Sequence, residues 1–259
     1  MLTQDELLIL QKKVEIIARN AGQFVLSRWS DVLPQSKGVE GDIVTEVDAK
    51  VEEQLKHALS GLVDGAYFFG EESGGELDGE YLWIIDPIDG TKNFAHKMPA
   101  FYVQFALLYK KNPILGIVYT PLGDQMFSAS YGNGCYLNSV RIDASELPPI
   151  NKSMIDIDFG GTELLDWKIN TLKKLANEVY RVRISAGMFA VYLLTGGTHA
   201  FVVINPTTKL WDQAPRIILF QEAGFEVEQF EVDGHKVILA SKGELFLKLK
   251  EIIINTVAL

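Results

Sequence analysis

The most informative residues of this sequence are two aspartates, Asp86 and Asp89, at the end of a hydrophobic stretch. Residues 83–91 read Trp-Ile-Ile-Asp-Pro-Ile-Asp-Gly-Thr. Two carboxylates on a turn stiffened by proline can converge on a hard cation, because Mg²⁺ prefers oxygen ligands. Gly90 would let a ligand approach the backbone, and a helix beginning at Thr91 would offer free N–H groups to an anion. The stretch is equally typical of an Asp-Pro turn with a helix cap, so alone it does not decide the chemistry.

Three further acidic segments could join such a site, although each has a structural explanation of its own. Glu71 lies in a Gly-Glu-Glu-Ser-Gly-Gly loop that would ordinarily be solvated. Asp212 follows a tryptophan at a predicted helix start, where an acidic residue is favourable in any case. Asp48 stands three residues after Thr45, which is the spacing of a capping box.

The elements around these segments predict where the acidic residues lie. Apolar positions at helical spacing predict helices over residues 7–28 and 45–59. Aromatic and β-branched runs predict strands at 66–69 and 81–85, which would place Glu71 and Asp86 at strand ends. Alternating segments separated by turn residues predict an antiparallel meander with strands at 102–109, 114–119, 125–129 and 134–137.

Beyond Arg141 the pattern alternates strands with helices, which is typical of α/β structure. The predicted strands are 154–157, 182–184 and 199–204, and the predicted helices are 164–176, 186–194, 211–223 and 244–256. Ser241 and Glu244 have capping-box spacing at the start of the last helix. We therefore expect an α+β half over residues 1–140 with most of the metal ligands. The α/β half over residues 141–259 would carry Asp212 and the residues that select the substrate.

Composition narrows the class of ligand. The 259 residues include 24 Lys and Arg against 34 Asp and Glu, a net charge of −10, with no long basic run. This balance argues against nucleic acid or an anionic membrane as a partner and favours a small molecule. Cys135 is the only cysteine, which excludes an internal disulfide framework and fits a reducing, cytoplasmic location. No apolar run reaches the roughly 20 residues of a membrane span, so we expect a soluble protein.

Taken together, four segments resemble the inositol monophosphatase family, within the superfamily that includes fructose-1,6-bisphosphatases. The matching segments are Asp42–Asp48, Gly70–Ser73, Asp86–Phe94, and Trp211-Asp212 followed by Glu222-Ala223-Gly224. The resemblance implies a layered αβαβα sandwich. It also implies a phosphatase that uses two or three Mg²⁺ ions and an activated water without a covalent intermediate. A homodimer and inhibition by Li⁺ are further implications of the resemblance.

The resemblance also assigns roles to particular residues. The implied metal ligands are Glu71, Asp86, the carbonyl of Ile88, Asp89 and Asp212. The implied catalytic pair, which orients the attacking water, is Asp48 and Thr91. The implied substrate-binding residues are Gly90 and Thr91 for the phosphate, with Ser185, Asn205 and Asp212 around the rest of the molecule.

The resemblance makes inositol-1-phosphate the first expected substrate. Asn205 stands where an animal inositol monophosphatase has a Glu that contacts the sugar hydroxyls. Fructose-1,6-bisphosphate and histidinol phosphate are therefore alternatives on the same fold. An alternative of another class is a non-catalytic protein that binds a phosphorylated metabolite or a protein partner. The intact set of Asp86, Asp89 and Asp212 argues against that alternative.

Overall fold

A computed structural model describes most of the chain, and contacts between Cα atoms divide it into two units. The described residues are 1–31, 35–36, 43–144, 146–161, 163–185, 187, 189–204 and 208–256. Unit 1 comprises Met1–Arg141 and Leu210–Glu222, and unit 2 comprises Ile142–Lys209 and Ala223–Leu259. The division departs from two continuous halves because the helix that carries Asp212 packs with the amino-terminal part of the chain.

Unit 1 is built on an eight-stranded sheet with the strand order β10-β9-β8-β7-β6-β5-β3-β4. The strands are β3 (Tyr67–Gly70), β4 (Gly74–Gly75), β5 (Tyr81–Asp89), β6 (Tyr102–Tyr109), β7 (Asn112–Thr120), β8 (Gln125–Ser130), β9 (Gly134–Leu137) and β10 (Val140–Ile142). Antiparallel pairing from β5 to β9 confirms the predicted meander, whereas β3 and β5 are parallel. A separate antiparallel pair joins β1 (Gln35–Ser36) to β2 (Ile43–Val44).

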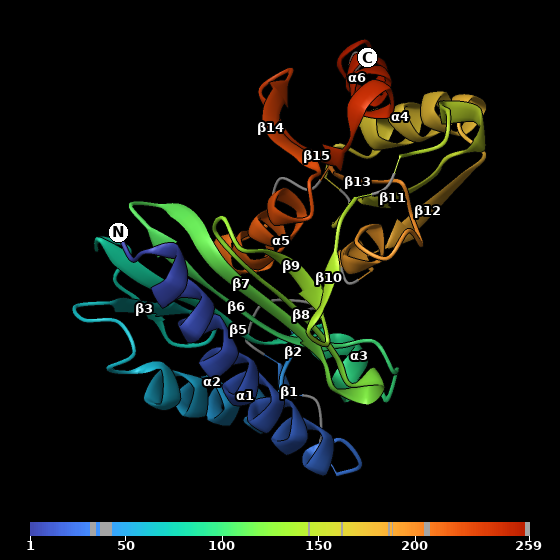
Figure 1. Cartoon of the computed structure of the whole chain (residues 1–259). Coiled ribbons are helices and arrows are strands. Elements are labelled where there is room, and N and C mark those ends of the chain that lie inside the picture. Colours follow the sequence, from blue (N-terminus) through green and yellow to red (C-terminus); the bar gives the residue numbers. More distant parts are fainter. Residues whose placement is uncertain are drawn as a thin grey trace. The chain divides into compact units, whose positions relative to one another are not determined.

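Helices cover both faces of this sheet (Figure 1). Two long helices, α1 (Gln4–Arg28) and α2 (Glu46–Leu59), lie side by side on one face, and α5 (Leu210–Glu222) lies on the other. The short helix α3 (Thr91–Ala95) follows β5, and a 3₁₀ turn, η1 (Pro121–Gly123), precedes β8. Unit 1 is therefore a three-layer α/β/α arrangement.

The alternation of side chains along β5 decides which layer each residue meets. Trp83 and Ile85 belong to the core shared with α1 and α2, whereas Ile84 packs with Ala214 of α5. Asp86 is two residues after Ile84, so its side chain points to the same face of the strand as Ile84. Its carboxylate therefore faces the α5 side of the sheet.

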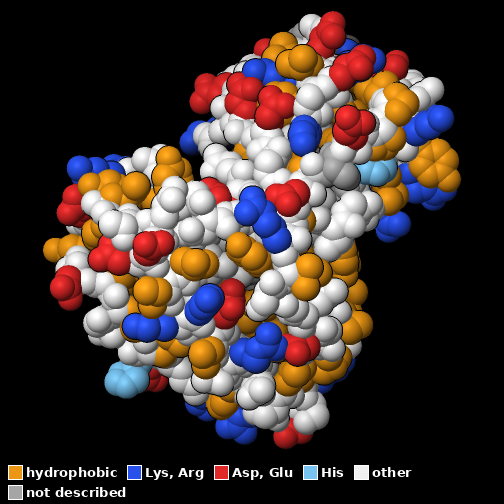
Figure 2. Space-filling model, viewed as in Figure 1, with side chains coloured by type: hydrophobic (Ala, Val, Ile, Leu, Met, Phe, Trp, Pro, Cys, Tyr) orange, Lys and Arg blue, Asp and Glu red, His pale blue; other side chains and the backbone are white. Residues whose placement is uncertain are grey.

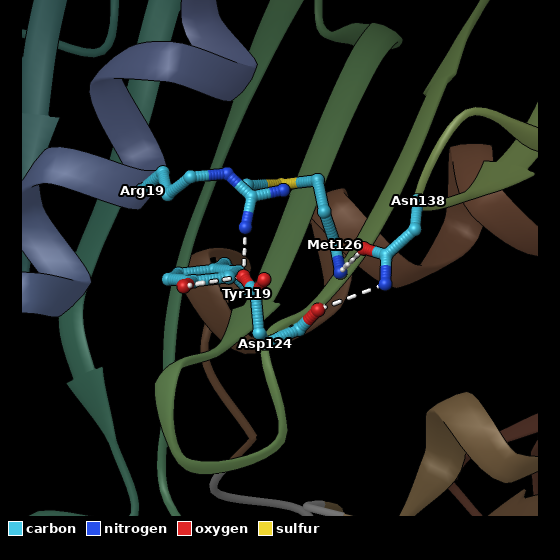
Figure 3. A network of polar contacts seen from close by, with 5 residues as sticks. All are labelled: Arg19, Tyr119, Asp124, Met126 and Asn138. Carbon is cyan, nitrogen blue, oxygen red and sulfur yellow. Dashed lines mark hydrogen bonds and ion pairs between the residues drawn. The ribbon is translucent and has the colours of Figure 1, made fainter.

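A polar network ties α1 to the turn between β7 and β8 (Figure 3). Arg19 forms an ion pair with Asp124, and the hydroxyl of Tyr119 donates to the same carboxylate at 2.9 Å. Asn138 bridges the turn to β8, because it accepts from the Met126 N–H at 2.9 Å and donates to the Asp124 carbonyl at 2.8 Å. These contacts fix α1 against the turn that joins β7 to β8, two interior strands of the sheet.

Unit 2 has a five-stranded mixed sheet with the order β12-β11-β13-β15-β14. Its strands are β11 (Met154–Asp158), β12 (Arg181–Ser185), β13 (Ala200–Val203), β14 (Glu226–Val232) and β15 (His235–Ser241). Its helices are α4 (Leu165–Glu178), α6 (Gly243–Ile254) and the 3₁₀ turns η2 (Ile150–Lys152) and η3 (Ala190–Leu193). Strand β11 pairs in parallel with β12 and β13, and the hairpin β14–β15 is antiparallel. The apolar side chains of the sheet, α4 and α6 form its core.

Two local predictions in unit 2 are wrong. The described part of 186–194 forms only the short turn η3. Ser241 belongs to β15 and donates its hydroxyl to the His199 carbonyl at 2.9 Å, so Lys242 is the N-cap of α6 and no capping box forms. Strand pairing of Ser241 with Glu226 outcompetes the local cap. The fold class is nevertheless the predicted mixed α/β class, with two large sheets and six α-helices among the described residues.

The surface carries mixed charges. On the face drawn in Figure 2, Lys and Arg side chains are scattered among acidic and apolar ones and form no continuous basic area. No helix within the described ranges combines the length and the hydropathy that crossing a membrane would require.

Candidate metal centre

The register between β3 and β5 brings two acidic segments together. Gly70 pairs with Ile85, and the N–H of Glu71 donates to the Ile85 carbonyl at 3.0 Å. Because the two strands are parallel, Glu71 leaves β3 beside Asp86. The sequence predicted that the strand would end at Asp86. Strand β5 instead continues to Asp89, with an irregular register between the two aspartates.

Three carboxylates meet at this edge of the sheet. Asp86, Asp89 and Asp212 each offer an oxygen, and these oxygens all lie within 4.8 Å of one another. Asp86 is 1% exposed, and Asp212 comes from the first turn of α5. Burial raises the pKa of Asp86 well above its usual value, and the charges of Glu71, Asp89 and Asp212 raise this pKa further. Carboxylates held this close are stabilised either by taking up a proton or by a compensating cation.

The hydrogen bonds of Asp86 test whether a cation would fit. Its Oδ2 accepts from Gln104 Nε2 at 2.9 Å, whereas its Oδ1 is buried without a hydrogen-bond partner among the described residues. A buried carboxylate oxygen with no donor is unusual in a folded protein. The surrounding ligand atoms are all carboxylate oxygens, which suits a hard divalent cation such as Mg²⁺.

The turn after β5 holds a second set of polar groups. Gly90 is the N-cap of α3 with φ 89°, a left-handed conformation that favours glycine, and α3 begins at Thr91 as predicted. The Thr91 hydroxyl lies within hydrogen-bonding distance of two acceptors, Asp48 Oδ1 at 3.0 Å and the Ile88 carbonyl at 2.8 Å. A carbonyl oxygen has two lone pairs, so this contact leaves Ile88 able to bind a cation as well.

Asp48 forms the capping box that its spacing predicts and also contacts Thr91. It caps α2, because its Oδ2 accepts from the Thr45 N–H at 2.8 Å and from the Thr45 hydroxyl at 2.5 Å. Its Oδ1 faces Thr91. Burial raises the pKa of Asp48, while the hydrogen bonds from Thr45 and Thr91 oppose this rise.

Three residues that support the centre were missed by reasoning from the sequence. Gln104 holds Asp86, and Arg216 of α5 forms an ion pair with Asp89. Glu52 of α2 accepts from the N–H of Glu72 at 2.8 Å and so fixes the loop that begins at Glu71. Burial raises the pKa of Glu52, but the hydrogen bonds of that loop outweigh it and keep this pKa below its usual value. Gln104 is a single polar residue within the otherwise apolar strand β6, which is the one signal in the sequence; Glu52 and Arg216 lie in helices that contain many polar residues and carry no such signal.

Ser185 and Asn205 were also predicted to contact the substrate, and both belong to the sequence range of unit 2. Ser185 ends β12 in unit 2, where its hydroxyl donates to Asp156 Oδ2 at 2.8 Å. Ser185 and Asp156 line a cavity of about 500 Å³ within unit 2. Asn205 lies outside the described residues.

A carboxylate cluster at the edge of a parallel strand pair, next to a helix start in a mixed α/β fold, defines a candidate centre for divalent cations. The chain belongs to the inositol monophosphatase family, whose model matches residues 7–257. Members of this family are metal-dependent phosphatases, and the chain is a phosphatase on their fold.

Relatives and solved structures carry several names. The chain is 33% identical over 224 residues to inositol monophosphatase 1 of Mus musculus, covering 81% of this chain and 79% of that protein. It is 30% identical over 236 residues to a fructose-1,6-bisphosphatase/inositol-1-monophosphatase of Thermotoga maritima, covering 89% and 88%. The crystal structure of the suhB protein of Bartonella henselae matches with a TM-score of 0.85 at 26% identity, covering 94% of this chain and 98% of that one.

Proposed function

We propose that this protein is a Mg²⁺-dependent phosphatase that hydrolyses a small phosphate monoester, with inositol-1-phosphate as the first candidate. The observation that carries the proposal is the buried Asp86 carboxylate, which has an oxygen without a hydrogen-bond donor and two further carboxylates within 4.8 Å. Two or three ions would be held by Glu71, Asp86, the Ile88 carbonyl, Asp89 and Asp212. When bound, such ions polarise the phosphate and lower the pKa of water.

Asp48 and Thr91 act as the proton-accepting pair in this proposal. Thr45 occupies Asp48 Oδ2 with two hydrogen bonds, so Oδ1 is the atom that receives a proton through the Thr91 hydroxyl. The raised pKa of Asp48 brings it closer to the operating pH, which favours general-base work. The N–H groups of Gly90 and Thr91 would bind the phosphate, because the start of a helix attracts anions.

The substrate beyond its phosphate is proposed from the names of relatives. The mouse relative is named for inositol monophosphate and the Thermotoga maritima relative for fructose-1,6-bisphosphate as well. Ser185, Asn205 and Asp212 are the residues that we propose to contact the rest of the substrate. Resemblance to the family also supports a cytoplasmic homodimer that is inhibited by Li⁺.

The test measures phosphate release from inositol-1-phosphate, fructose-1,6-bisphosphate and histidinol phosphate, with Mg²⁺ and with EDTA. We expect turnover only with Mg²⁺ and preference for one substrate. Asp86→Asn should lower kcat at least about 100-fold, because it removes the central ligand. The matched control is Asp124→Asn, the same change at a carboxylate bound to Arg19 and Tyr119, which should keep near-normal kcat. Near-normal kcat in Asp86→Asn would refute the metal assignment.

A further inference from the structure

Arg216 lies beside the carboxylate cluster on the same face of α5 as Asp212. The two residues are four positions apart, so their side chains share one side of the helix. The Arg216 guanidinium donates to Asp89 Oδ2, and the side chains of Arg216 and Asp89 are only 4% and 11% exposed. The ion pair is therefore largely shielded from water and from dissolved salt.

The side chain of Arg216 carries a permanent positive charge. A guanidinium stays protonated at any pH at which proteins fold. It is placed against a group of carboxylates, Asp86, Asp89 and Asp212, whose oxygens lie within 4.8 Å of one another and therefore repel each other when ionised. Arg216 thus supplies a permanent positive charge at the point where divalent cations would supply theirs.

Two consequences follow from this placement. Without metal, the guanidinium offsets part of the carboxylate repulsion and keeps α5 attached to β5. With metal, the same charge repels an incoming cation, and the guanidinium engages an oxygen of Asp89 that a cation would otherwise use.

We propose that Arg216 is an internal counter-cation, a positioning residue that stabilises the metal-free centre and weakens the binding of a divalent cation by Asp89 and Asp212. The inference rests on the proposed function only in requiring that the centre binds divalent cations. It predicts that this protein needs a higher concentration of divalent ion to fill its centre than it would without the guanidinium.

The test is a calorimetric titration of the full chain with Mn²⁺ after removal of metal by EDTA and dialysis. Arg216→Gln keeps a neutral donor and should bind Mn²⁺ at least about tenfold more tightly than the wild type. Arg216→Lys keeps the charge and should stay within about threefold of the wild type. Arg19→Gln removes an arginine from the separate ion pair with Asp124 and should leave Mn²⁺ affinity unchanged.

A second measurement leaves Arg216 intact, in case Arg216→Gln does not fold. In the metal-free chain, Asp86→Asn should raise Tm because it relieves repulsion between carboxylates. Asp89→Asn should lower Tm, because it removes the negative charge with which the buried guanidinium pairs at this position. Opposite shifts from the same change, three residues apart, are expected of a counter-cation.

The outcomes separate the inference from the proposed function. Weaker Mn²⁺ binding in Arg216→Gln, equal binding in Arg216→Gln and the wild type, or a rise in Tm for both aspartate variants would overturn the role of Arg216. A wild-type chain that binds no Mn²⁺ would instead refute the metal centre itself.

Discussion

Asp48 serves two neighbours with its two carboxylate oxygens. One oxygen holds the start of α2 through Thr45, and the other faces the hydroxyl of Thr91. The bond from the Thr45 hydroxyl is one of the contacts that keep the pKa of Asp48 from rising further. A helix cap therefore tunes the group that we propose as the base.

Thr45→Val tests this coupling. A base works when deprotonated, so activity falls as the pH drops through the raised pKa of Asp48. Loss of the Thr45 hydroxyl should raise that pKa, which moves the acid limb of a kcat–pH profile to higher pH. The variant should also lose about 1 kcal/mol of stability with its cap. Thr3→Val breaks the equivalent capping box in α1 and should lose similar stability without moving the acid limb.

The members of the carboxylate cluster were predictable from the sequence, but the residues that hold them in place were not. Asp86, Asp89 and Asp212 were predicted as ligands and lie together. Gln104 and Arg216 could not be placed from the sequence, because their partners come from other strands and helices. Their roles depend on register and on which face of the sheet α5 covers.

At the scale of elements, the loop that follows β3 is held in place by side chains of the helix α2. Glu52 of α2 accepts from the N–H groups of Glu72 and Ser73, and Lys56 pairs with the same carboxylate at 3.0 Å. The loop therefore depends on α2 for the orientation of Glu71.

Glu52→Gln is expected to weaken divalent binding by about 10–100-fold, because supporting residues of metal ligands typically contribute that much. The amide oxygen of the glutamine can accept a hydrogen bond from one of these N–H groups. Its NH₂ group would face the other N–H, so two donors would meet. Mn²⁺ titration measures the effect. Glu80→Gln, an exposed glutamate paired with Lys110, is the control. Unchanged affinity in Glu52→Gln would mean that the loop holds its shape without α2.

The approach of α5 to the sheet depends on a glycine in β7. A Cβ at Gly116 would lie 2.4 Å from Ile218 Cγ2 and 2.6 Å from the Pro215 carbonyl oxygen. Gly116→Ala should therefore shift α5, with a cost of about 1–3 kcal/mol in unfolding free energy and weaker divalent binding by Asp212. At Gly123 the nearest atom would be 3.4 Å away, so Gly123→Ala should change neither quantity. Denaturant unfolding of both variants measures the change in unfolding free energy, and Mn²⁺ titration measures the change in divalent binding.

Most elements were predictable because their apolar periodicity reports which side is buried. The failures occurred where non-local pairing decides the outcome. Ser241 has the spacing of a cap but pairs with Glu226 as a strand residue. The polar, alternating sequence of β14 becomes a strand because β15 lies beside it, and β14 itself contains no continuous run of apolar residues.

At the scale of the whole molecule, the two units have separate cores, and the stability of unit 2 is expected to depend on the protonation of a histidine. In unit 2, His199 Nδ1 accepts from the Met154 N–H at 2.9 Å, which requires a neutral imidazole. Burial lowers the pKa of His199 below its usual 6.5. The unfolded chain then takes up the proton first, so stability is retained above pH 6.5 and falls as the pH drops below it.

His199→Asn should flatten this dependence, since an amide oxygen can accept the Met154 N–H without titrating. The measurement is Tm between pH 7.5 and 5.5, and the wild type should lose more stability over this range than the variant. The exposed His57 of α2 supplies the control, because His57→Asn should behave as the wild type. Equal slopes for His199→Asn and the wild type would refute the assignment.

The segment Leu210–Glu222 belongs to unit 1 although unit 2 surrounds it in the sequence. A ribosome therefore completes the eight-stranded sheet well before it makes the helix that covers one face. At about 5–20 residues per second, residues 142–209 take roughly 3–14 s to synthesise. During that time Leu82, Ile84 and Leu108 are not yet covered by α5. Nascent chains that end between these two points are the ones expected to recruit a chaperone, and release should come when α5 emerges.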